Sequence, residues 1–129
     1  MSAGVAGWVE VARLDGLVAE RPVAAAVEGV DLVVVREGDE VRVLSGRCPH
    51  RAARLAQHGA VRCGVLVCQR HGWDFRLDNG EPPGGRGEGL TRFEARIDPA
   101  DGAVRVSLAA VRAHAALHPP VFHEDEDVA

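Results

Sequence analysis

Two short segments of the chain together carry two cysteines and two histidines that could bind a metal. Cys48 and His50 flank a proline, and Cys68 and His71 flank a Gln-Arg pair. Each segment supplies one thiolate and one imidazole. Four such ligands suit either a tetrahedral zinc ion or an iron–sulfur cluster with histidine on one iron. Zinc fingers of this composition usually keep their cysteines together and their histidines together, whereas both segments here are mixed.

The mixed segments, with a Gly-Trp pair directly after the second histidine, resemble the Rieske [2Fe–2S] family. The resemblance implies one [2Fe–2S] cluster per chain. It places Cys48 and Cys68 on the inner iron, and His50 and His71 on the outer, more exposed iron. Imidazole ligands raise the reduction potential of such a cluster above that of an all-cysteine cluster. The expected cofactor is therefore a carrier of single electrons.

Four residues near the ligands suggest which branch of the family the chain resembles. High-potential Rieske proteins have a disulfide at the positions that hold Ala53 and Arg70 in this sequence. They also have serine and tyrosine hydroxyls, which stabilise the reduced cluster, where this chain has Trp73 and Phe75. The resemblance is therefore to the low-potential group of Rieske-type ferredoxins and oxygenase-associated domains.

Three functions follow as hypotheses. The first is a single-electron carrier that passes electrons from a reductase to an oxygenase or similar acceptor, with partners docking near His50 and His71. The second is an electron-entry module or subunit of a larger bacterial oxidoreductase. The third is a zinc-stabilised binding module without a redox role. The chain has no room for a further domain with mononuclear iron, which Rieske oxygenases also need. We therefore assign no catalytic residue and expect no enzymatic activity from the chain alone.

The charge distribution suggests where a partner could dock. The chain has 15 basic and 19 acidic residues, and four of the acids lie in the tail from Glu124 to Asp127, so the rest is balanced. Positions 47–78 contain only two acidic residues, Asp74 and Asp78, but six arginines: Arg47, Arg51, Arg54, Arg62, Arg70 and Arg76. These arginines are either solvated loop charges or a docking face for an acidic redox partner.

Alternating and β-branched segments predict an all-β domain with one helix. The expected strands are 8–14, 21–27, 30–36, 41–44, 65–68, 73–77, 91–97 and 103–108, with a helix over 109–117. The resemblance implies the Rieske fold, an antiparallel β-sandwich with an inserted cluster-binding subdomain at about 46–84 and a short C-terminal helix. We expect one domain over residues 1–117 and a flexible acidic tail over 118–129.

The remaining features give weaker signals. The opening residues lack a basic signal-peptide region, and no apolar run is long enough to span a membrane. We expect a cytoplasmic protein without a nucleic-acid or membrane partner. With two cysteines assigned as ligands, Cys63 is left as a surface or reactive thiol. His58 is expected at the surface, and the spacing of His114 and His118 leaves a second metal site open beside ordinary solvation.

Overall fold

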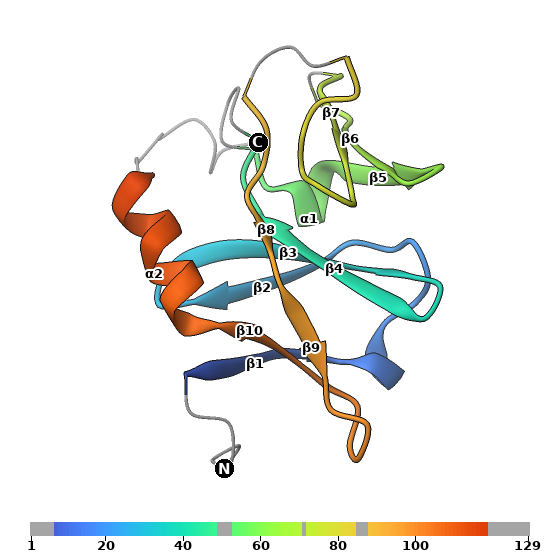
Figure 1. The fold of residues 1–129 in the computed structure, drawn as a ribbon. Helices are drawn as coiled ribbons and strands as arrows, with labels where there is room; N and C mark the ends of the chain where they lie inside the picture. Colours follow the sequence, from blue (N-terminus) through green and yellow to red (C-terminus); the bar gives the residue numbers. More distant parts are fainter. Residues whose placement is uncertain (1–6, 49–52, 71, 85–87, 119–129) are drawn as a thin grey trace.

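The computed structural model describes residues 7–48, 53–70, 72–84 and 88–118, and these residues form three antiparallel sheets and short helices (Figure 1). In chain order the elements are β1 (Trp8–Arg13), the 3-10 helix η1 (Leu14–Gly16), β2 (Val23–Val27), β3 (Val30–Glu37), β4 (Glu40–Ser45), α1 (Leu55–His58), β5 (Gly59–Arg62), β6 (Val65–Cys68), β7 (Asp74–Arg76), β8 (Arg92–Phe93), β9 (Ala95–Ile97), β10 (Ala103–Ser107) and α2 (Leu108–Leu117). The mostly-β class and the short C-terminal helix predicted from the sequence are confirmed.

Two of the sheets pack around a shared hydrophobic core, and we call these two sheets together with α2 the base of the molecule. One has the strand order β1-β10-β9 and the other the order β2-β3-β4-β8. β8 and β9 follow one another in sequence but belong to different sheets, so the chain passes from one sheet to the other around Glu94. Buried side chains from both sheets, from α2 and from the residue after η1 fill this lower core: Leu17, Val27, Leu32, Val34, Val41, Val43, Phe93, Val104, Val106 and Val111.

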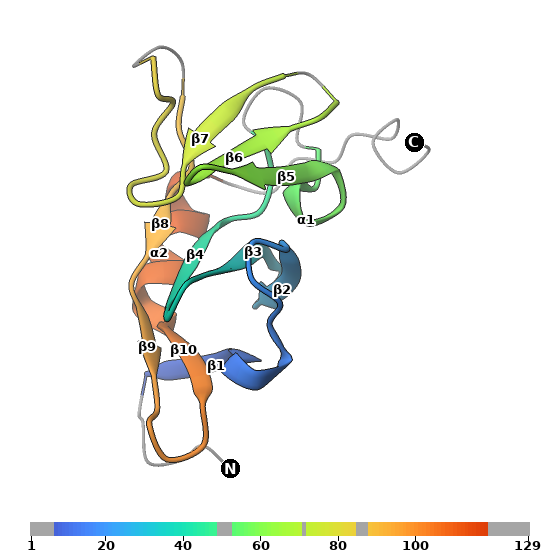
Figure 2. The same ribbon diagram turned by 90° about the vertical axis from the view of Figure 1, so that its right-hand side faces the viewer.

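The third sheet, β5-β6-β7, is inserted between β4 and β8 and lies above the other two (Figure 2). Together with α1 it packs on the upper face of the sheet β2-β3-β4-β8, which is therefore the middle sheet of the three. β3 is therefore buried on both faces, because side chains alternate along a strand. Leu32 and Val34 enter the lower core, whereas Val33 and Val35 enter the upper one. The upper core is completed by buried residues from several elements: Leu44, Cys48, Ala53, Leu55, Leu66, Cys68, Phe75, Leu77 and Leu90.

The helix α2 is capped at its start and is joined to the lower sheets by two of its side chains. The Ser107 hydroxyl caps its start by accepting a hydrogen bond from the Ala110 amide at 3.2 Å. Arg112 makes two hydrogen bonds of 2.8 and 2.7 Å to the Glu28 carboxylate in the β2–β3 turn. Nearer the end of the helix, His114 bonds to Thr91. No helix in the described part of the chain is long and apolar enough to cross a membrane.

Most predicted strands agree with the structure within two residues, and the hairpin over 98–102 joins β9 and β10 as expected. The expected strand at 91–97 is two strands, β8 and β9. α1 and β5 were not predicted, because this segment looked like a turn around Gly59. The predicted division into a domain over 1–117 with a subdomain at about 46–84 stays a prediction, and residues 119–129 of the tail lie outside the described residues.

Candidate metal centre

The first ligand segment leaves the middle sheet at a fixed point. Ser45, the last residue of β4, donates its amide to the Thr91 carbonyl at 2.8 Å and accepts the Thr91 amide on its hydroxyl at 2.9 Å. The Gly46 amide donates to the Asp31 carbonyl at 2.9 Å. A Cβ atom at Gly46 would lie 2.8 Å from the Leu32 carbonyl carbon, so only glycine lets the chain pass this close to β3.

Backbone hydrogen bonds join the residues on the two sides of positions 49–52, and we call this hydrogen-bonded part the neck of the first cysteine loop. The Leu55 amide donates to the Gly46 carbonyl, and the Cys48 amide donates to the Ala53 carbonyl, both at 2.9 Å. Arg47 and Arg54 form an isolated antiparallel bridge between these two bonds. The Arg47 side chain pairs with the Asp31 carboxylate, with 2.7 Å between Nε and Oδ2. Cys48 is therefore placed at the neck by backbone contacts and by an ion pair to β3.

The second ligand segment begins at the end of β6 and is closed by backbone hydrogen bonds. The Cys68 amide donates to the Trp73 carbonyl, and the Gly72 amide donates back to the Cys68 carbonyl, both at 2.7 Å. Gly72 has a φ of 76°, which favours glycine in this turn. The next amide, that of Gln69, donates to the His58 carbonyl at 2.8 Å. This bond ties the second loop to the end of α1.

Both cysteines belong to the upper core. Cys48 is 1% exposed, Cys68 is fully buried, and both belong to the same cluster of packed residues. No disulfide joins them. Two buried, unlinked thiols at the necks of two loops suit a cofactor that is held by thiolates on its inner side. His50 and His71 lie outside the described residues, and the described residues contain no metal-binding group of three or more ligands.

The spare histidines and the third cysteine have other surroundings. His114 Nδ1 lies 2.8 Å from the Thr91 hydroxyl, and its ring stacks on that of His118 at 4.4 Å between centroids. Burial, and to a smaller extent the nearby His118, hold the pKa of His114 below its usual value. These contacts favour structural roles for the two histidines at the end of α2 over a second metal site. Cys63 is exposed in the β5–β6 turn with a φ of 51°, and His58, expected at the surface, is half-buried.

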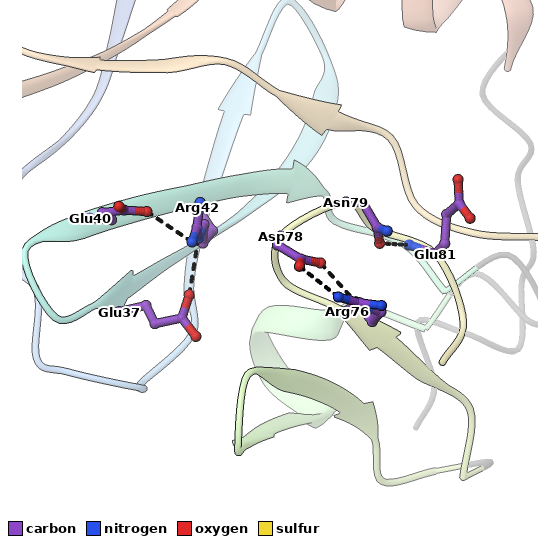
Figure 3. A network of polar contacts seen from close by, with 7 residues as sticks. All are labelled: Glu37, Glu40, Arg42, Arg76, Asp78, Asn79 and Glu81. Carbon is purple, nitrogen blue, oxygen red and sulfur yellow. Dashed lines mark hydrogen bonds and ion pairs between the residues drawn. The ribbon is translucent and has the colours of Figure 1, made fainter. Parts of the chain in front are cut away.

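The arginines around the site divide into two groups. Arg47 pairs with Asp31, and Arg76 makes hydrogen bonds of 3.1 and 2.8 Å to the two oxygens of Asp78 (Figure 3). The Arg76 hydrogen bonds hold the pKa of Asp78 below its usual range. Arg54, Arg62 and Arg70 are exposed, and the described residues provide none of these three with an ion-pair partner. Arg51 lies outside the described part.

Figure 3 also shows the polar seam between the inserted sheet and the β3–β4 hairpin. Arg42 pairs there with Glu37 at 3.0 Å and with Glu40 at 2.8 Å. The seam contains a cavity of about 410 Å³ near the β5–β6 turn. The cavity lies at the closed end of the β5–β6 hairpin, whereas Cys68 lies at its open end, paired with Gly59. The charges in the seam are paired with one another and are separate from the cysteine site.

Comparisons with known proteins agree with the site. The sequence model of the Rieske [2Fe–2S] domain family matches residues 7–89. The ferredoxin of carbazole 1,9a-dioxygenase from Nocardioides aromaticivorans superposes with a TM-score of 0.71 and 28% identity, over 79% of this chain and 98% of that one. The ferredoxin component of the alkene monooxygenase system of Xanthobacter autotrophicus is 32% identical over 57% of this chain and 61% of its own length.

Other curated relatives are much longer than this chain. Cholesterol 7-desaturase of Drosophila melanogaster is 33% identical over 57% of this chain, but the match covers 18% of the desaturase. The matches thus fall within larger proteins as well as in small ferredoxins. The family match spans well over half of the chain and includes both cysteine loops. The chain belongs to the Rieske [2Fe–2S] domain family, and its cofactor is one [2Fe–2S] cluster.

Proposed function

We propose that the chain is a single-electron carrier whose cluster is held by Cys48, His50, Cys68 and His71. The observation that carries the proposal is the pair of buried, unlinked cysteines at the necks of two closed loops. A pair of thiolates on the buried side leaves the histidine side toward solvent, which is the side a partner must approach. The bound cluster supplies the one-electron chemistry.

The residues of the chain position the cluster and keep water from its inner side. Both thiolates would lie among apolar side chains of the upper core, including Leu55, Leu66 and Phe75. Low-dielectric surroundings disfavour the extra negative charge of a reduced cluster, so they lower its reduction potential. Phe75 is fully buried and offers no hydroxyl. These surroundings support a potential toward the lower end of the Rieske range, on the order of −150 mV rather than +300 mV.

We favour a ferredoxin that receives electrons from a reductase and delivers them to an oxygenase or similar acceptor, with docking near His50 and His71. The near-complete coverage of a dioxygenase ferredoxin supports this role. A second candidate is the electron-entry module of a larger oxidoreductase, which the partial match to longer proteins supports. We place either form in the cytoplasm, where thiols stay reduced. The presence or absence of a reductase gene and an oxygenase gene beside this one would separate the two candidates.

The proposal is tested by the metal content of the purified protein. We expect two irons and two acid-labile sulfides per chain, red-brown colour, and a low-temperature EPR signal only after reduction. Cys48→Ser and Cys68→Ser should lose the cluster and lower the thermal stability, because cluster binding and folding are linked. Cys63→Ser is the matched control and should keep both. A colourless protein with one zinc per chain would contradict the proposal and favour the zinc-stabilised module.

A further inference from the structure

Two of the arginines near the cysteine loops have exposed and uncompensated charges. Arg54 and Arg70 are both exposed and have no ion-pair partner among the described residues. Arg47 differs, because the Asp31 carboxylate lies 2.7 Å from its Nε atom. Arg76 differs in the same way through Asp78. The six arginines that crowd this part of the sequence are therefore not equivalent.

The structure brings Arg54 and Arg70 to the same end of the inserted sheet. The His58 amide donates to the Arg54 carbonyl at 2.9 Å, and the His58 carbonyl accepts the Gln69 amide at 2.8 Å. Arg70 follows Gln69 directly, so a single residue, His58, links the backbones beside the two arginines. Arg54 also follows Ala53, the hydrogen-bond partner of Cys48. We call Arg54 and Arg70 the arginine pair.

Among the residues that the structure describes, the acidic side chains nearest to this sheet lie away from the arginine pair or are paired with other arginines. Glu37 and Asp78 line the seam at the closed end of the β5–β6 hairpin and pair with arginines there. The exposed carboxylate nearest in sequence to the second loop is Asp74. It lies on β7 opposite Val67, on the far side of β6 from β5 and α1. Two unpaired positive charges thus stand beside the cysteine loops on the α1 side.

We infer that the arginine pair docks a redox partner through acidic side chains on that partner. The inference rests on the proposed electron-carrier function. Exposed charges of this kind contribute little affinity but steer encounter, and they act over about 10 Å at 0.1 M salt. Arg54 and Arg70 flank the loops that carry the cluster. An acidic partner drawn to them arrives where electron transfer has the shortest path.

The test uses small redox probes of opposite charge, because they report the charge near the cluster directly. Holoprotein reduced by one electron is mixed in a stopped-flow instrument with the anionic cobalt(III)–EDTA complex or the cationic cobalt(III) hexaammine complex. Each cobalt(III) takes one electron from the reduced cluster and becomes cobalt(II). We expect oxidation by the anion to slow as salt rises, and oxidation by the cation to slow less or to speed up.

Charge reversal then locates the effect. Arg54→Glu and Arg70→Glu should each slow the anionic probe about threefold at low salt and speed up the cationic one. Arg62→Glu is the matched control, because Arg62 is an exposed arginine of the same sheet without an ion-pair partner, but it lies at the closed end of the hairpin. It makes the same change in net charge and should alter either rate much less. A tetraglutamate peptide should slow the anionic probe in the wild type and not in the two variants.

The outcomes separate this inference from the proposed function. Loss of the cluster signal in the wild type would count against the electron carrier itself. A normal cluster with equal rates in Arg54→Glu, Arg70→Glu and Arg62→Glu would show that only net charge matters, and the inference would be wrong. Faster oxidation by the anion in the variants would also overturn it, because the two arginines would then not attract a negatively charged partner. Unchanged cluster spectra in all variants are required before the rates are compared.

Discussion

At the scale of single residues, Asp31 holds the first ligand loop through two of its groups. Its carbonyl accepts the Gly46 amide, and its carboxylate pairs with Arg47. The second loop relies on backbone hydrogen bonds around Cys68, and within the described part of the chain no side-chain ion pair joins this loop to the two lower sheets. Asp31 lies on β3, far from the cysteines in sequence. No motif in the sequence identified it, because an aspartate at a strand start is also typical of an ordinary surface residue.

The Asp31–Arg47 pair should control how readily the first loop opens. Asp31→Asn removes the charge but keeps the size of the side chain and one acceptor. Both side chains are about one-third exposed, so the pair contributes at most about 1 kcal/mol. That is about fivefold in a local opening equilibrium. We expect roughly fivefold faster cluster loss to an iron chelator, followed by visible absorbance, with little change in the unfolding temperature.

The matched control for Asp31→Asn is Asp78→Asn. Asp78 also pairs with an arginine, at 2.8 Å and with both side chains half exposed, but it lies in the seam away from the cysteines. This variant should release the cluster at the wild-type rate. Equal release rates in the two variants would mean that the Asp31 pair is only a surface contact without effect on the loop.

At the scale of elements, β3 connects the two cores of the molecule. Val34 lies in the lower core and Val35 in the upper core with the two cysteines, and both are fully buried. β3 also pairs with β2 on one side and β4 on the other. The strand therefore contributes side chains both to the core of the two lower sheets and to the core that contains the cysteines.

Val34→Ala and Val35→Ala should have similar effects on stability but different effects on the cluster. Each removes two buried methyl groups and should cost about 2 kcal/mol of unfolding free energy. Only Val35→Ala opens space beside the residues that hold the cysteines. We therefore expect it to speed cluster loss to a chelator at a temperature where both variants are folded. Equal rates of cluster loss at matched stability would argue against separate upper and lower cores.

The sequence predicted β3 well, because its nearly continuous β-branched run indicates a strand buried on both faces. It did not predict α1 and β5. Gly59 looked like a turn residue, but a Cβ atom there would collide with Leu55, so glycine is needed for a close approach between α1 and β5. The passage from β8 to β9 was also hidden, since a strand that changes sheets keeps the same alternation. Tertiary contacts decide both cases.

At the scale of the whole molecule, stability should depend on pH through the contact between α2 and β8. His114 on α2 bonds to Thr91, and its ring meets the edge of Phe93 at 5.6 Å between centroids. Two other titratable groups lie near this contact, His118 and Glu88, and the His118 Nε2 atom is 3.6 Å from the Glu88 carboxylate. Burial first, and His118 second, lower the pKa of His114 from 6.5. The folded state therefore favours the neutral ring.

The sign of the pH effect follows from that direction. Above about pH 6.5 the ring is neutral in both the folded and the unfolded chain, and the contact stabilises fully. As the pH falls through 6.5 toward the lower pKa of the folded state, the unfolded chain takes up the proton first and stability is lost. We expect a lower thermal unfolding temperature at pH 5.5 than at pH 7.5, measured by circular dichroism.

His114→Gln should reduce this pH dependence, because an amide can still bond to Thr91 but does not titrate in this range. The visible absorbance must be followed in parallel, so that acid loss of the cluster is not mistaken for unfolding of the chain. An equal drop in the unfolding temperature of His114→Gln and wild type would show that other groups cause the pH effect.

The paired hydrogen bonds between Ser45 and Thr91 have a consequence for how such a protein can change in evolution or by design. The chain leaves the two lower sheets at Ser45 and returns to them at Thr91, and these two residues are hydrogen-bonded neighbours in space. Insertions, deletions or a transplanted segment between Ser45 and Thr91 therefore need not alter the strand order of the base. The limit is set by Val33, Val35 and Leu44, whose apolar surface must be covered by whatever replaces that segment.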